Sequence, residues 1–325
     1  MPHTGGMPTA TKPPSTDWAE DLTPDEKARH AGFAETIVGL QARISRKVGP
    51  GRAFHRKQVA ALRGTLTVPA DLPEYAVQGL FARPGVQPVV IRMSNGAMVP
   101  QPDAVPDIRG LALSVRGLDG PGALGTPTDR QDFLLINRTA FGFEDSRDFA
   151  ELVPVAIRGQ SALVRHLVAK YGIVGGSLEM ARQVAELARP FSGFATSGFH
   201  SCAPVAWGPY AAHVHVQPVG AGRDLLAWRN WGGDIRGRIA QGPLRWNLQA
   251  QFYTDPDATP IEDGRRAWNS PKVTVGLLQA DELADAEEVA ADHFDPWMAL
   301  QAHRPLGEIM RARKAAYLAS FRNRT

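Results

Sequence analysis

The sequence has only one cysteine, no long apolar run and no large excess of either charge. Cys202 is the sole cysteine among 325 residues, which excludes an internal disulfide and any zinc or iron–sulfur site built from several cysteines. The 36 basic and 33 acidic residues leave a formal net charge of +3, so no basic surface of the kind that binds nucleic acid dominates. We therefore expect a small-molecule partner, no nucleic acid and a cytoplasmic location.

The N-terminal segment contains no apolar stretch that could serve as a signal-peptide core or a membrane span. Residues 1–22 are rich in Pro, Thr and Gly, so we expect a flexible tail there and a single domain over residues 23–325. Thr23-Pro24-Asp25-Glu26 has the form of a capping box, which predicts an amphipathic helix that ends near Lys47.

The rest of the chain alternates between strand and helix patterns. Between Gly64 and Asn137, short β-rich runs separated by Pro, Gly and Asp predict antiparallel strands: TLTV, VVIRMS, GLALSV and FLLIN. Residues 145–190 have the apolar spacing of helices, and strands resume in YAAHVHVQPV, RWNLQAQFY and KVTVGLLQ. With a terminal helix from about Pro305 and no internal repeat, we predict one α+β domain, a sheet or barrel with helical insertions.

Three polar residues of the predicted terminal helix lie on one face, where they could act together on a ligand. Arg313, Tyr317 and Arg324 are spaced by four and seven residues, which returns them to nearly the same helical face. A protonated phenol is a poor iron ligand, but a ferric ion and an arginine one turn away both favour the phenolate. Arg324 could pair with a haem propionate. The alternative is a basic, solvated helix in which Tyr317 only packs.

Shorter motifs precede this helix. Arg52 and His55 form an R-x-x-H motif, and Arg92 and Ser94 form an R-x-S motif whose two-residue step puts both side chains on one face of a strand. D-x-R-G-x-A follows at residues 107–112, and then a segment from Asp132 that contains Asn137 and Phe149. Taken alone, each motif is nonspecific, and His55 would be a surface histidine beside basic residues.

In this order, the motifs resemble the haem-binding segments of catalases. The resemblance runs from about Gly51 to the C-terminus and implies a catalase-like antiparallel β-barrel with helical insertions and a C-terminal haem-anchoring helix. It implies haem b (iron protoporphyrin IX) as the cofactor. Tyr317 is then the axial ligand of the iron, and Arg313 supports its phenolate.

The resemblance assigns the other candidates to the surroundings of the haem. His55 would be the distal acid–base group, Ser94 would orient it, and Asn137 would orient the peroxide. Phe149 would stack on the haem face, and Phe54 would contact the cofactor beside His55. Three arginines would bind haem propionates: Arg52, Arg92 and Arg324.

Two positions depart from the catalase pattern. Counted from Asp132, the usual Asn-Asn pair falls on Ile136-Asn137, so Asn137 either orients peroxide or caps the end of a strand. Phe54 stands where catalases carry a small branched residue, and its ring would crowd peroxide or form an apolar wall for a larger substrate. We therefore expect weak dismutation of hydrogen peroxide.

These observations predict a haem peroxidase that reduces hydrogen peroxide or organic hydroperoxides with an organic electron donor. A fatty-acid hydroperoxide rearrangement like that of catalase-related allene oxide synthases, or a non-catalytic haem-binding protein, remain as alternatives. The chain ends soon after the haem helix, which removes material that interlocks catalase tetramers, leaves a homodimer open and argues against a firmly bound nicotinamide cofactor. His213 and His215 share one face of a probable strand, but no nearby ligand completes a metal site.

Overall fold

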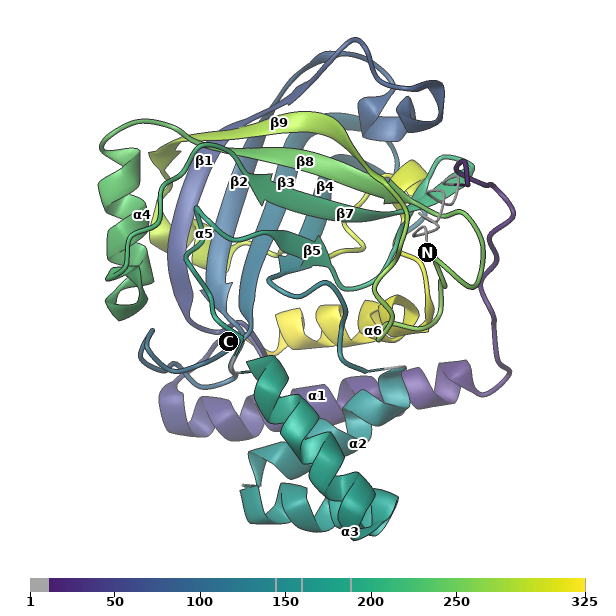
Figure 1. Cartoon of the computed structure of the whole chain (residues 1–325), viewed down its shortest axis with the longest axis vertical. Coiled ribbons are helices and arrows are strands. Elements are labelled where there is room, and N and C mark those ends of the chain that lie inside the picture. Colours follow the sequence, from purple (N-terminus) through teal and green to yellow (C-terminus); the bar gives the residue numbers. More distant parts are fainter. Residues whose placement is uncertain (1–11, 144, 159, 188, 325) are drawn as a thin grey trace, which may run out of the picture.

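The strand patterns of the sequence form one antiparallel barrel in the computed structural model, which describes residues 12–143, 145–158, 160–187 and 189–324. Within these residues the strands are β1 (Gln58–Val68), β2 (Gly85–Asn95), β3 (Arg109–Pro121), β4 (Pro127–Ile136), β5 (Phe199–Ser201), β6 (Val205–Trp207), β7 (Tyr210–Pro218), β8 (Leu244–Phe252) and β9 (Lys272–Leu283). Their order is β5-β4-β3-β2-β1-β9-β8-β7-β6, and the additional pairing of β5 with β7 closes the barrel (Figure 1). The predicted α+β class and antiparallel strands are confirmed.

Strand β2 shows which groups face the inside of the barrel. Val89, Ile91 and Met93 are buried in the main apolar core, whereas Arg92 and Ser94 alternate with them and therefore point to the outer face. The candidate polar residues on this strand thus lie outside the barrel. They need a second layer to cover them.

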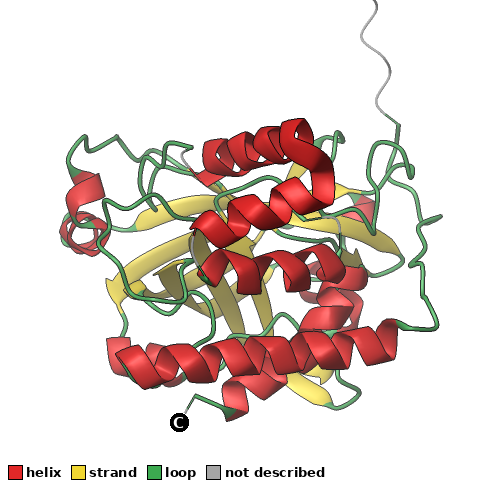
Figure 2. Ribbon diagram, turned by 90° about the horizontal axis from the view of Figure 1, so that it is seen from below, coloured by secondary structure: helices red, strands yellow, loops and turns green. Residues whose placement is uncertain are grey.

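Helices supply that layer. Those in the described residues are α1 (Glu26–Val48), α2 (Ser146–Ile157), α3 (Gln160–Leu187), α4 (Trp231–Ile239), α5 (Ala286–Ala291) and α6 (Glu308–Arg322). Helices α1 and α6 pack side by side under the barrel, and α2 and α3 lie on the same side (Figures 1 and 2). Helix α3 bends at Gly172, whose φ is 74°. No helix within the described ranges is long and apolar enough to cross a membrane.

The expected flexible tail over residues 1–22 does not hold for residues 12–22, which lie against the barrel. The Ser15 N–H donates to the carbonyl of Tyr253 at 2.9 Å, and the Glu20 carboxylate pairs with Arg311 at 2.8 Å. Residues 1–11 lie outside the described residues. The sequence does not reveal this docking because each partner is more than two hundred positions away in the chain.

The predicted helix to about Lys47 is confirmed as α1, but the capping box at its start forms only in part: after the hydrogen bond from Arg311, one from the Thr23 backbone helps to lower the pKa of Glu26. The helix begins at Glu26, and Asp25 makes no capping hydrogen bond through its side chain. The Glu26 carboxylate binds Arg311 of α6 at 2.7 Å. This long-range ion pair ties α1 to the helix that carries Tyr317.

Candidate active site

His55 lies in a strained loop between α1 and β1. Its φ of 52° is the only positive φ of a non-glycine residue in the described part of the chain. Arg92 holds this conformation by donating from Nη2 to the His55 carbonyl at 2.8 Å, and the His55 N–H donates to the carbonyl of Gly96 at 3.0 Å. Backbone strain of this kind persists where the surroundings impose it, and it concentrates at functional sites.

The imidazole of His55 rests on the outer face of β2 and β3. Its Nδ1 is 3.0 Å from Ser94 Oγ, while the orienting role of this hydroxyl stays a prediction. Gly110 lies opposite Ser94 in the sheet, and a Cβ there would be 2.5 Å from His55 Nδ1, so a glycine is needed to make room for the ring. No hydrogen bond from the described residues reaches His55 Nε2, which leaves that nitrogen free for a substrate. Sequence reasoning missed Gly110, because it gave the D-x-R-G-x-A motif at residues 107–112 no role at the site.

Arginines surround this histidine. Burial, followed by the charges of Arg92, Arg313 and Arg52, lowers the pKa of His55 to about 3. The imidazole is therefore neutral at neutral pH. A neutral ring can accept a proton, which an imidazolium cannot.

The arginines themselves have few anionic partners. Arg52 and Arg324 both donate to the backbone carbonyl of Asp292, at 2.7 and 3.0 Å. Burial, followed by repulsion from Arg92 and Arg324, lowers the pKa of Arg52 to about 8. The Nε of Arg324 is buried and has no hydrogen-bond partner among the described residues. The positive charge of this arginine cluster is not neutralised by nearby carboxylates, and a ligand with two carboxylates would neutralise it.

Tyr317 lies within reach of the same arginines. Burial raises the pKa of its phenol, and the charges of Arg313 and Arg52 act in the opposite direction. Its hydroxyl makes no hydrogen bond to a described residue. Arg313, one helical turn earlier, lies over the ring of Phe141 with 4.9 Å between guanidinium carbon and ring centroid. The R-x-x-x-Y and R-x-x-H motifs, far apart in sequence, thus meet in one electrostatic cluster.

Aromatic rings cover one side of the cluster. Phe54 contacts Phe149 edge to face, with 5.7 Å between ring centroids, and Phe149 also packs on Phe33 of α1. Phe141 and Phe143 complete the group around Phe149. The structure therefore brings Phe149 against Phe54, the neighbour of His55 in the chain, while the contact of both rings with haem stays a prediction.

Asn137 makes the contacts expected of a strand cap. Its Oδ1 accepts the Arg109 N–H at 2.8 Å, and its own N–H donates to the Arg109 carbonyl at 3.0 Å. The row of paired residues under His55 runs from Ser94 through Gly110 to Ile136. The β4 side chain on this face of the sheet is therefore the apolar one of Ile136. These contacts favour the capping alternative, and a distal role for the Asn137 amide stays a prediction that would depend on Nδ2.

Asp292 is a further residue that sequence reasoning missed. Its carboxylate pairs with Arg116 and Arg130, while its backbone carbonyl receives Arg52 and Arg324. It thereby fixes two of the predicted propionate-binding arginines. No sequence pattern could mark this role, because the acceptor is a backbone oxygen 240 positions away from Arg52.

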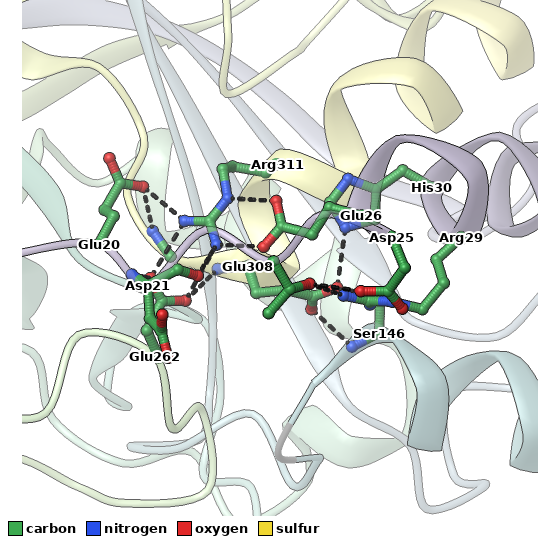
Figure 3. A network of polar contacts seen from close by, with 12 residues as sticks. Glu20, Asp21, Asp25, Glu26, Arg29, His30, Ser146, Glu262, Glu308 and Arg311 are labelled. Atoms are coloured by element: carbon green, nitrogen blue, oxygen red, sulfur yellow. Dashed lines mark hydrogen bonds and ion pairs between the residues drawn. The ribbon is translucent and has the colours of Figure 1, made fainter.

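A polar network fixes α6 against α1 and α2 (Figure 3). Glu308 accepts hydrogen bonds from Arg29 at 2.7 Å, from His30 Nε2 at 2.8 Å and from the Ser146 N–H at 2.8 Å. Arg311 pairs with three carboxylates, those of Glu20, Glu26 and Glu262. Because Glu308 and Arg311 lie nine and six residues before Tyr317 on the same helix, the network fixes the part of α6 that carries the phenol.

The histidines of β7 form a hydrogen-bonded element instead of a metal site. His215 Nδ1 lies 2.6 Å from His200 Nδ1, and its Nε2 lies 3.0 Å from Gln251 Oε1. His213 Nδ1 is 2.9 Å from Ser201 Oγ. Across the described ranges, no three His, Cys, Asp or Glu side chains are arranged to hold a metal.

Comparison with known proteins finds similarity in structure. No protein-family model matches the chain. No curated protein sequence matches it either. The solved structures that match include a fungal catalase (TM-score 0.68, 18% identity), catalase A of Saccharomyces cerevisiae (0.69, 17%) and a bacterial catalase (0.66, 18%).

These alignments cover 98% of this chain and 66%, 68% and 64% of the three catalases, so the chain spans about two thirds of their length. The predicted catalase-like fold is confirmed. At this level of identity the likeness concerns the fold, and the chemistry has to be argued from the site.

Proposed function

We propose that this protein is a haem-dependent oxidoreductase, a peroxidase that reduces hydrogen peroxide or organic hydroperoxides and has weak catalase activity. The observation that carries the proposal is the convergence of His55, Tyr317 and four arginines from three distant sequence motifs into one cluster. Purified protein supplied with haem should oxidise an organic donor in proportion to the hydroperoxide consumed. Donor oxidation no faster than with free haem would contradict the proposal.

The residues present fit haem b. Tyr317 offers a phenol without a hydrogen-bond partner for the iron, and Arg313 would stabilise its phenolate. Haem carries two propionates, which match the unneutralised charge of Arg52, Arg92 and Arg324, including the orphan Nε of Arg324. When bound, the haem iron would supply the redox chemistry that cleaves the peroxide bond.

The chain's own residues would handle the proton. His55 Nε2, neutral and free, takes a proton from the hydroperoxide hydroxyl and returns it to the departing oxygen. Ser94 keeps Nδ1 occupied, and Arg92 holds the backbone that aims the ring. Two electrons and two protons from the organic donor convert ROOH to ROH and water.

Phe54→Val is expected to raise hydrogen peroxide dismutation, by roughly tenfold if the ring mainly crowds the peroxide. Phe54 contacts Phe149 beside His55, so removing the ring opens space next to the acid–base group. Oxygen evolution measured with an electrode checks this. An unchanged rate, or a wild-type enzyme that is already fast, would show that Phe54 does not restrict the site.

Gly110→Ala is expected to lower hydroperoxide reduction by on the order of 10- to 100-fold, because a Cβ 2.5 Å from Nδ1 must displace the imidazole. The measurement is donor oxidation at equal haem content. Gly85→Ala is the matched control on β2, since nothing lies within 4 Å of its added Cβ. Equal activity of both variants would show that the room Gly110 leaves for the His55 imidazole does not matter for activity.

The apolar surroundings also support a second candidate. Phe54 and Ile136 flank His55, and such walls suit a fatty-acid hydroperoxide that rearranges without an external donor. Product analysis separates the two functions: an epoxide or its hydrolysis products favours rearrangement. If the protein binds haem but does not react with any peroxide, it is a non-catalytic haem-binding protein. The cytoplasmic location and the homodimer stay predictions.

A further inference from the structure

The loop between β7 and α4 carries three large apolar side chains that are exposed to solvent. Leu225, Leu226 and Trp228, here called the apolar tip, are 83%, 58% and 45% exposed. Asp224 Oδ1 accepts the Leu226 N–H at 2.8 Å, and the Leu226 carbonyl accepts the Arg229 N–H at 3.1 Å. A turn bonded in this way holds both leucines outward, where they contribute nothing to the core.

Basic side chains surround the apolar tip. Arg223 and Arg229 flank it in sequence and are exposed, and the Arg229 guanidinium lies over the Trp228 ring at 5.4 Å. The Val219 N–H donates to the carbonyl of Arg245 at 2.9 Å, which brings a third arginine to the base of the loop. From residue 219 to residue 229 the sequence has one acid, Asp224, and its carboxylate is engaged in the turn.

We propose that the apolar tip binds the surface of an anionic lipid bilayer. The leucines would enter the acyl boundary, Trp228 would lie at headgroup level, and Arg223 and Arg229 would contact lipid phosphates. A protein partner fits less well, because a stable interface needs about 800 Å² from each side and three side chains cannot supply it. Interfacial binding needs only a few apolar groups with basic neighbours.

The apolar tip lies at the same end of the barrel as the His55 loop. The Trp231 N–H, three residues after the tip, donates to Asp103 Oδ2 at 2.9 Å. Asp103 Oδ1 pairs with Lys57 Nζ at 2.6 Å, two residues after His55. A bound bilayer would therefore present lipid hydroperoxides to the site, and this last step rests on the proposed function.

Sedimentation with vesicles tests the membrane contact without any turnover. The full-length protein should partition onto phosphatidylcholine vesicles that contain phosphatidylglycerol, less onto pure phosphatidylcholine, and less again when sodium chloride is added. The double variant Leu225→Ser/Leu226→Ser should lower the partition coefficient by at least about tenfold. Leu178→Ser on α3 is the matched control, because its leucine is similarly exposed, at 68%, far from the tip in sequence.

Two results would overturn the proposal. One is vesicle binding that the double variant retains. The other is a wild-type protein that ignores anionic vesicles but forms a dimer that the double variant loses, which would assign the apolar tip to a second copy of the chain. Failure of the peroxidase activity alone would leave the vesicle result intact.

Discussion

Tyr317→Phe is expected to lose haem, with the haem content of the purified protein falling by about 10- to 100-fold. The phenylalanine keeps the ring packing and removes only the oxygen, which has no hydrogen-bond partner among the described residues and lies under the charge of Arg313 and Arg52. Haem content and the visible spectrum after reconstitution measure the effect. Wild-type protein should show the spectrum of a tyrosinate-ligated ferric haem.

Tyr171→Phe provides the control for this experiment. Tyr171 is 47% exposed on α3, and its substitution should leave haem content unchanged. If Tyr317→Phe binds haem with the wild-type spectrum, the phenol only packs, and the alternative of a structural tyrosine on a basic helix is the correct one. Loss of soluble protein would call for Tyr317→His, which offers the iron a different ligand and should shift the spectrum.

His55→Ala is expected to retain haem and to slow hydroperoxide reduction by about 10²- to 10⁴-fold, the usual contribution of a positioned acid–base group. Stopped-flow mixing with hydroperoxide, at matched haem content, measures the effect. His166→Ala on α3 is the control histidine. A His55→Ala variant that reacts at the wild-type rate would mean that proton transfer does not depend on this ring.

The strained backbone at His55 can be tested separately, by comparing the stability of two variants. Because its φ of 52° disfavours any residue with a side chain, His55→Gly should be more stable than His55→Ala by about 1 kcal/mol in denaturant unfolding. Equal stability of the two variants would mean that the strain seen in the loop is not present in solution.

The pH dependence follows from the direction of the pKa shift. Burial and the arginines lower the pKa of His55 to about 3, so the proton-accepting neutral form predominates above that pH. The rate of hydroperoxide reduction should therefore stay level between about pH 7 and pH 5, whereas a histidine with the ordinary pKa of about 6.5 would lose most of its neutral form. A rate that falls with an apparent pKa near 6.5 would place the ring in a more polar setting.

Periodicity and short motifs were enough to predict most of the fold. Short runs of β-forming residues bounded by Pro, Gly and Asp marked most of the strands, and apolar spacing of three and four residues marked the region of α2 and α3, because each signal depends only on the local sequence. The motif residues Arg52, His55, Ser94, Arg313 and Tyr317 were singled out by the resemblance of their ordered motifs to catalase segments. Local signals failed where the partner was remote, as for segment 12–22, which packs against the barrel.

The sequence by itself determined the α+β class and, through its resemblance to catalases, the candidate residues for haem binding and proton transfer. Only the tertiary structure decided how they act: the left-handed backbone of His55, the space that Gly110 leaves for its ring, and the Asp292 carbonyl that gathers Arg52 and Arg324. It also showed that Ile136, and not Asn137, occupies the sheet row under the imidazole. These features depend on backbone atoms and strand register, which arise when distant segments pack and leave no mark in the local residue pattern.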